Sequence, residues 1–199
     1  MRPRLVLASA SPARLQLLRS AGFDPTVAVS GVEEAAPGLP TSEAVVTIAT
    51  RKASAVAAEF SDALVIGCDS LLDVDGEGMG KPGSAAAAIA LWRSLRGRPA
   101  TLRTGHCLID TRTGASALGV ASTIVRFGSP TDDELDAYVA TGEPLAVAGG
   151  FTIEGYGAPF VDGIDGDASN VIGLSLPLFR SLLAQLGVPL TDLWAPRPA

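Results

Sequence analysis

The stretch VIGCDSLLDVDGEGMGKP, residues 65–82, predicts the centre of the fold. It opens as an apolar, β-branched run typical of a buried strand, and Asp69 and Ser70 follow where that run ends. The chain then turns through Asp-Gly-Glu-Gly, so a hairpin would bring Lys81 back towards Asp69, and a carboxylate and a cation would share one opening. Alternatively, Asp69 caps a neighbouring turn and Lys81 only solubilises a loop.

Composition narrows the class of protein. A chain of 199 residues, with 47% hydrophobic and 18% charged residues, predicts one globular domain spanning residues 1–199. No apolar run approaches the ~20 residues of a membrane span, and Leu5-Val6-Leu7 is too short for a signal-peptide core of ~7 to 15 residues, so we expect a cytoplasmic protein without a membrane partner. The net charge of -6 opposes binding to polymeric nucleic acid. Two cysteines and one histidine suggest neither a zinc site nor a disulfide framework.

The first strand candidate, Arg4 to Ala8, leads into a short polar turn. Ser11 is a good helix N-cap and Pro12 a good first helical residue. A helix N-terminus offers free N–H groups, and Ser9 and Arg14 add donors, so this turn could hold a phosphate. A plain capped helix with Arg14 in solvent is the alternative.

The rest of the chain alternates helical and extended patterns. Helices are predicted for residues 41–60, 84–97, 131–142 and 177–186, and strands for residues 27–30, 101–109 and 117–127, the last two forming an antiparallel hairpin. Arg51 and Lys52 are most simply the polar face of the first of these helices. We therefore expect an α/β domain with a mixed β-sheet and flanking helices, and a frayed Pro-rich tail over residues 195–199.

The segment from Gly149 to Gly157 is rich in glycine. Such density permits close backbone approach, as in a wall that lies against a planar ligand. An irregular β segment with bulges is the other interpretation.

Five stretches, in this order, resemble the Maf-like nucleotide pyrophosphatases. They are Leu7-Ala8-Ser9-Ala10-Ser11-Pro12-Ala13-Arg14-Leu15-Gln16-Leu17-Leu18; Arg51-Lys52-Ala53; Ile66-Gly67-Cys68-Asp69-Ser70 with Gly80-Lys81-Pro82; Thr141-Gly142-Glu143-Pro144 with Ala148-Gly149-Gly150; and Gly166-Asp167 with Asn170-Val171-Ile172-Gly173-Leu174. The resemblance implies an inosine triphosphatase-like fold with two lobes around a deep cleft, and a homodimer. It also implies hydrolysis of a nucleoside triphosphate to the monophosphate and pyrophosphate, with a divalent metal, Mg²⁺ or Mn²⁺.

The resemblance also implies roles for individual residues. Asp69 falls on the general base for the attacking water and, with Glu34, on the metal side of the cleft. The positions that hold the substrate are Ser9, Arg14, Lys52, Ser70 and Lys81. These acids and cations suit attack at the α-phosphorus, which needs an activated water and positive charge around the departing pyrophosphate.

Departures from the family pattern concern substrate preference more than reaction type. They are Ala13 for an arginine, Ser70 for a threonine, Ala100 for a histidine and Val147 for a lysine. Members acting on thymidine and uridine triphosphates typically have Gln at the position of Glu154. A carboxylate only accepts hydrogen bonds, which suits the two donors of a guanine edge, so we expect guanine-type (7-methyl-GTP-like) or broad substrates over dTTP and UTP. Alternatively, Glu154 faces solvent and does not contact the base.

Two other functions compete with this prediction. One is a nucleotide-binding regulator of septum formation that needs no turnover. The other is a phosphatase that releases orthophosphate from small metabolites. The retained acid at Asp69 favours the enzyme.

Overall fold

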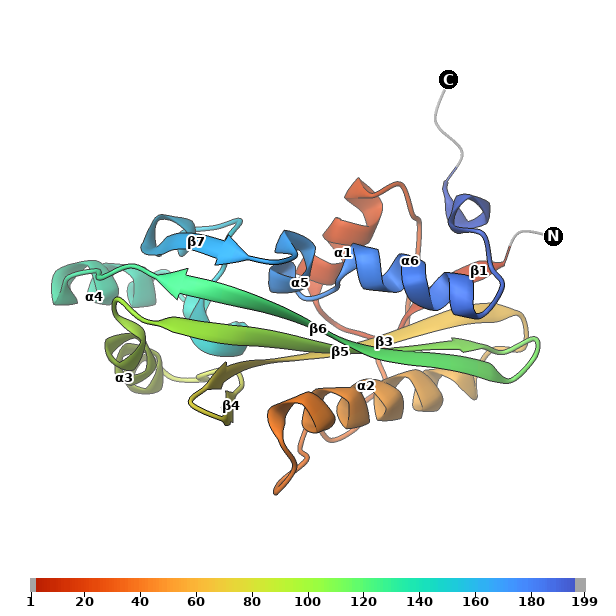
Figure 1. Cartoon of the computed structure of the whole chain (residues 1–199), viewed down its shortest axis with the longest axis horizontal. Helices are drawn as coiled ribbons and strands as arrows, with labels where there is room; N and C mark the ends of the chain where they lie inside the picture. Colours follow the sequence, from red (N-terminus) through yellow and green to blue (C-terminus); the bar gives the residue numbers. More distant parts are fainter. Residues whose placement is uncertain (1–2, 196–199) are drawn as a thin grey trace.

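One mixed sheet of seven strands forms the centre of the molecule in the computed structural model, which describes residues 3–195 (Figure 1). Across the sheet the strands run in the order β2 (Thr26–Val27), β1 (Arg4–Leu7), β3 (Ala63–Val74), β5 (Pro99–Asp110), β6 (Ala115–Phe127) and β7 (Val161–Asp165), and β4 (Glu77–Met79) pairs with β3. Strand β1 is parallel to β2 and β3, whereas the other pairs are antiparallel. The expected α/β fold with a mixed sheet is confirmed.

Helices cover both faces of this sheet. They are α1 (Pro12–Ser20), α2 (Thr41–Ala57), α3 (Ala85–Leu95), α4 (Asp132–Ala140), α5 (Ala168–Ile172) and α6 (Leu176–Gln185), with 3₁₀ turns η1 (Glu143–Ala146), η2 (Ala148–Gly150), η3 (Ala158–Phe160) and η4 (Leu190–Leu193). Helix α2 lies on one face, and α1, α5 and α6 lie on the other (Figure 1). Within residues 3–195, no helix combines the length and the apolar character needed to cross a bilayer.

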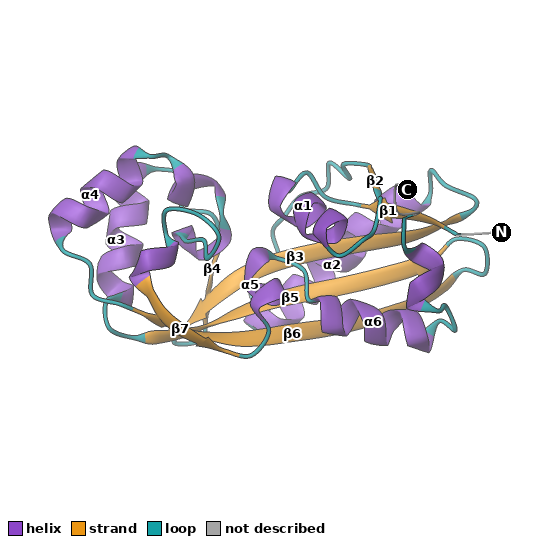
Figure 2. Cartoon of the chain, turned by 90° about the horizontal axis from the view of Figure 1, so that it is seen from above, coloured by secondary structure: helices purple, strands orange, loops and turns teal. Residues whose placement is uncertain are grey.

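Two large apolar clusters pack at different places along the long strands. The α6 cluster joins β1, α1 and α6 to the sheet; its large members include Leu7, Leu18, Ile66, Leu108, Phe179 and Leu182. The Trp92 cluster is aromatic and includes Leu72, Trp92, Phe127, Tyr138 and Phe151. Figure 2 shows the corresponding helix groups at opposite ends of β3, β5 and β6. These three strands, of 12, 12 and 13 residues, belong to both ends.

Two glycines let α2 lie directly on the sheet. A Cβ at Gly67 would come within 2.7 Å of the Ala53 backbone nitrogen, and closer still to the carbonyl oxygen of Ala49. A Cβ at Gly105 would meet the α2 backbone in the same way, at 2.5 Å from the nitrogen of Val46. The helix is thus held against β3 and β5 where Asp69 emerges, because Asp69 is paired with Gly105.

Most of the predicted elements are confirmed, including the Ser11 cap, the capping box at Thr131 and the long hairpin. The second strand is Thr26–Val27 instead of 27–30, and α2 ends at Ala57 instead of Phe60. The interpretation of Lys52 as part of a polar face is wrong, because its side chain is buried against the sheet. Residues 196–199 of the tail expected to fray lie outside the described residues. The single-domain and two-lobe expectations stay predictions.

Candidate active site

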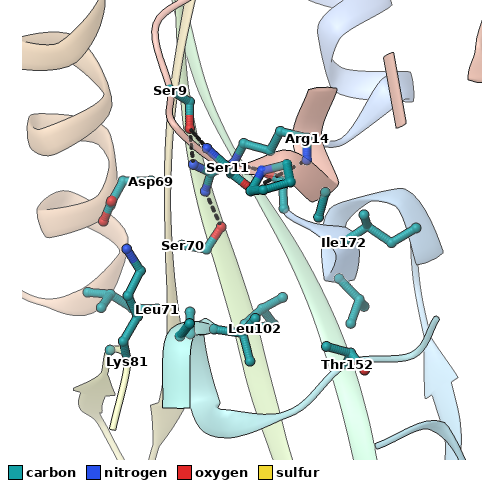
Figure 3. Close-up of a pocket in the computed structure, with 18 of the residues that line it drawn as sticks. Ser9, Ser11, Arg14, Asp69, Ser70, Leu71, Lys81, Leu102, Thr152 and Ile172 are labelled. Carbon is teal, nitrogen blue, oxygen red and sulfur yellow. Dashed lines mark hydrogen bonds between the residues drawn. The ribbon is translucent and has the colours of Figure 1, made fainter. Parts of the chain in front are cut away.

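A cavity of about 550 Å³ brings together every site residue that the sequence singled out. The residues that line the cavity include Ser9, Arg14, Glu34, Lys52, Asp69, Ser70, Lys81 and Glu154. Figure 3 shows Ser9 and Arg14 at one end of this cavity and Thr152 at the other. The roles of these residues stay predictions, but their convergence from segments distant in sequence is a property of the fold.

A pair of carboxylates brackets one buried ammonium at the centre of the site. The Lys52 Nζ lies 2.7 Å from Asp69 Oδ1 and 2.6 Å from Glu34 Oε1. Lys81 Nζ lies 3.8 Å from the other oxygen of Glu34, and Figure 3 shows its side chain pointing towards Asp69. The hairpin of β3 and β4 therefore returns Lys81 to the opening beside Asp69, as expected.

The pKa values of the two carboxylates shift in opposite directions, and the two side chains differ in burial. Burial raises the pKa of Asp69 above its ordinary value, although Lys52 and Arg14 oppose this shift. Burial also disfavours ionised Glu34, but it is the more exposed of the two, and the hydrogen bond and charge of Lys52 keep its pKa below the ordinary value. A pKa raised by burial suits a carboxylate that accepts a proton, and Asp69 is the one with that shift.

A buried guanidinium occupies the other end of the polar lining. Arg14 Nε donates to the Gly173 carbonyl at 2.6 Å, and its two terminal nitrogens donate to Ser9 Oγ and Ser70 Oγ, each at 3.0 Å (Figure 3). These partners are neutral oxygens, so they orient the charge of Arg14 without cancelling it. Because Arg14 also lies in the first turn of α1, beside that helix's positive dipole end, this region favours an anion.

A hydroxyl and imidazole network behind Arg14 was missed by sequence reasoning. Ser70 Oγ is 2.9 Å from Thr104 Oγ1, and the carbonyl of Thr104 lies 3.0 Å from His106 Nδ1. The Ser175 N–H donates to His106 Nε2, so Nδ1 carries the proton, and burial lowers the pKa of His106 to about 4. The only available signal was the alternation along residues 102–106, which puts Leu102, Thr104 and His106 on one face of the strand.

Cys68, next to Asp69, is an unreactive neighbour. Its side chain is fully buried in the α6 cluster, and burial raises the pKa of the thiol to about 12. The thiolate needed for redox chemistry is therefore strongly disfavoured.

The glycine-rich segment forms part of the cavity wall as the end of the 3₁₀ turn η2 and the loop after it, not as a strand. Ala146, Val147 and Ala148 line the cavity on one side of Gly149, and Phe151, Thr152 and Glu154 line it on the other. Gly149 and Gly150 have φ of 73° and 67°, a left-handed conformation that favours glycine.

The donor set at Glu34 and Asp69 fits a hard divalent cation. Both carboxylates already contact one positive group, the Lys52 ammonium, so their oxygens converge on a single point. Mg²⁺ is commonly bound by one or two carboxylates, with waters and substrate phosphates completing its shell. Within residues 3–195 no cluster of three or more His, Cys, Asp or Glu side chains could hold a metal by itself. The site therefore fits a metal that is bound by these two carboxylates and whose coordination shell is completed by the phosphates of a bound ligand.

An α/β scaffold with converging carboxylates, three cations and a helix N-terminus in one cavity is an arrangement suited to a phosphorylated ligand. The family model described as "Maf-like protein" matches residues 4–186, and the chain belongs to this family. It is similar to proteins named nucleoside triphosphate pyrophosphatase from Streptomyces coelicolor (62% identity; 98% of this chain and 96% of the relative) and Saccharopolyspora erythraea (56%; 97% and 98%). It is also similar to one of the same name from Synechocystis sp. (50%; 98% and 100%). The resemblance noted in the sequence is confirmed.

Proposed function

We propose that this chain hydrolyses nucleoside triphosphates to the monophosphate and pyrophosphate, as a house-cleaning enzyme of the nucleotide pool. The expectation of an enzyme of the nucleoside triphosphate pyrophosphatase class is confirmed by relatives of that name, 50–62% identical over nearly the whole chain. The observation that carries the proposal is the placement of the buried Asp69 carboxylate beside Lys52, in a cavity that Arg14 and Lys81 also line.

In the proposed reaction, Asp69 accepts a proton from a water as the water oxygen attacks the α-phosphorus. A bond forms between that oxygen and phosphorus, and the bond from phosphorus to the bridging oxygen of the pyrophosphate breaks. The leaving pyrophosphate takes the electron pair, and cations stabilise the charge that develops on it. Arg14, Lys52 and Lys81 are the groups suited to this task, because their charges converge on the same cavity.

Glu34 and Asp69 would hold the divalent metal, Mg²⁺ or Mn²⁺, that the family resemblance implies. Bound there, the ion would supply charge neutralisation to the substrate phosphates. Lys52 occupies the point on which the carboxylates converge, so its ammonium would move towards the phosphates when nucleotide and metal enter.

Glu154 is proposed to read the base. Glu154 lines the cavity two residues after Thr152, which Figure 3 shows at the end opposite Ser9 and Arg14, and its carboxylate offers acceptors only. Two acceptors suit the N1–H and N2 amino donors of guanine, so 7-methyl-GTP-like or broad substrates are proposed over dTTP and UTP. A panel of these triphosphates tests the assignment, and much faster turnover of dTTP than of guanine nucleotides would refute it.

The experiment for the reaction is product identification by ion-exchange chromatography with Mg²⁺, run on the wild type and Asp69→Asn. We expect monophosphate and pyrophosphate from the wild type and loss of turnover by at least about 100-fold in the variant. Asp73→Asn is the matched control, since Asp73 lies on the same strand but pairs with Arg103 and does not line the cavity.

Other outcomes identify the competing functions. Release of orthophosphate would indicate the phosphatase. Nucleotide binding without turnover in the wild type would indicate the regulator of septum formation.

The setting of the enzyme is also a proposal. We propose a cytoplasmic homodimer of single-domain subunits, each spanning residues 1–199, that acts on free nucleotides and binds neither membranes nor polymeric nucleic acid. The net charge of -6 supports the last point, because it opposes attraction to a polyanion. Light scattering coupled to gel filtration measures the oligomeric state, and a monomer at all concentrations would refute the dimer.

A further inference from the structure

Glu143 holds together two segments that form the Thr152 side of the cavity. Its Oε1 accepts hydrogen bonds from the hydroxyl of Tyr138 at 3.0 Å, from Thr152 Oγ1 at 2.7 Å and from the Gly157 N–H at 3.0 Å. Its Oε2 accepts from the Tyr156 N–H at 2.9 Å. We call these five residues the Glu143 network.

The loop is shaped around this carboxylate. A Cβ at Gly155 would lie 2.8 Å from Glu143 Cδ, and nearer to its Oε2. A Cβ at Gly157 would lie 2.6 Å from the Tyr138 hydroxyl oxygen. Backbone at these two positions thus passes so close to the network that only glycine fits without displacement.

All four groups that face Glu143 are donors, and no ion pair in residues 3–195 involves Glu143. Burial disfavours its charge, but the hydrogen bonds from Thr152, Tyr156, Gly157 and Tyr138 outweigh this and keep the pKa of Glu143 below its ordinary value. A carboxylate satisfies this arrangement. A glutamine of the same shape would turn an N–H towards one of the donors.

The network lies apart from the groups proposed for the chemistry. Thr152 and Glu154 line the cavity from the loop that Glu143 holds, and Ala146 to Ala148 line it just after Glu143 itself. Asp69 and Lys52, in contrast, come from β3 and α2. Loss of the network would therefore displace the wall around the base while leaving the phosphate groups in place.

We propose that Glu143 is a positioning residue that sets base selectivity by fixing the loop carrying Thr152 and Glu154. The inference rests on the proposed function, since it names what orders the base-reading wall of that site. It does not depend on which base Glu154 prefers.

The test is steady-state kinetics of Glu143→Gln with a guanine and a pyrimidine nucleoside triphosphate. Loss of one buried hydrogen bond weakens binding by about tenfold, so we expect the KM for the preferred nucleotide to rise about tenfold. The selectivity ratio between the two substrates should fall by a similar factor, with kcat within about threefold of the wild type. Competitive inhibition by inorganic tripolyphosphate, which has no base, should be unchanged.

Glu134→Gln is the matched control. Glu134 also accepts hydrogen bonds through its carboxylate, in the capping box of α4, but it does not line the cavity, so its kinetics should equal those of the wild type. If Glu143→Gln does not fold, Tyr138→Phe replaces it. That variant removes one donor and keeps the ring, and should raise KM about threefold with tripolyphosphate inhibition unchanged.

Three results would overturn the inference. The first is a folded variant whose selectivity ratio and KM equal those of the wild type. The second is a fall in kcat while KM stays constant. The third is a loss of inhibition by tripolyphosphate as large as the loss of affinity for the nucleotide. If the wild type binds but does not hydrolyse nucleotides, the proposed function fails, and the same comparison is made on dissociation constants by calorimetry.

Discussion

Substitution of Gly67 by alanine tests how α2 positions the candidate site. The new Cβ would lie 2.7 Å from the Ala53 nitrogen and closer to the Ala49 oxygen, whereas ordinary contacts begin at 3.4 Å. Both obstructing atoms are backbone, so no side-chain rotation relieves the overlap, and the helix must withdraw by about 1 Å. Lys52 lies between these two residues in the helix and would withdraw from Asp69 with it.

The magnitudes follow from this geometry. Overpacking a core costs about 1–3 kcal/mol, and we expect a Cβ that overlaps backbone atoms to cost about 3 kcal/mol. For a chain of this size that corresponds to a fall in Tm of about 6–12 °C, measured by circular dichroism. A displacement of about 1 Å in a catalytic group lowers kcat/KM by about 100-fold.

The matched control is Gly80→Ala. Gly80 lines the cavity, but a Cβ there would meet only Leu71 Cδ2, at an ordinary 3.7 Å, so stability should change by less than about 0.5 kcal/mol. If Gly67→Ala melts within about 2 °C of the wild type and keeps its activity, then this contact neither holds α2 at the sheet nor sets the position of Lys52.

Two more predictions concern buried ionisable side chains. Neutral His106 is favoured in the fold, and its pKa falls from 6.5 to about 4, so the unfolded chain takes up the proton first and stability falls as pH drops through this range. His106→Gln should remove about 3 kcal/mol of this pH-dependent loss in urea unfolding, and an unchanged pH dependence would contradict the assignment. Lys52→Met should bind free Mn²⁺ about tenfold more tightly than the wild type by calorimetry without nucleotide, because the ammonium no longer competes for Glu34 and Asp69. Equal or weaker binding by the variant would show that the carboxylates do not form the metal site.

Local signals predicted the elements that depend on local chemistry. The Ser11 and Thr131 caps satisfy backbone groups within three residues, so they can be read directly from the chain. The β3–β4 hairpin followed from turn residues in the same way. These elements were sufficient to place Asp69 and Lys81 at one opening.

The burial of Lys52 was predictable but missed. Its position continues the apolar stripe of Val45, Ile48 and Ala49 at helical spacing, and a cation on such a stripe must meet an acid at the sheet. Assigning it to the solvated face of the helix on charge alone gave the wrong interpretation.

Other contacts have no local signal. Arg14 meets Gly173 across 159 residues, and Asn170 donates to the Leu102 carbonyl across 68. Nothing in the sequence near Glu143 indicates that four donors from two segments converge on it. Such contacts are set by how the sheet brings remote segments together, which periodicity and turn chemistry do not encode.

The separation of the α6 cluster from the Trp92 cluster bears on how substrate range can diverge among related enzymes. The wall formed by residues 143–157 packs with the Trp92 cluster at one end of the long strands, through Phe151 and Ile153. Arg14 belongs to α1, and Leu18 of the same helix packs in the α6 cluster. If the proposed roles hold, the residues around the base can change at one end of the sheet without altering the core that supports the proposed phosphate-binding groups.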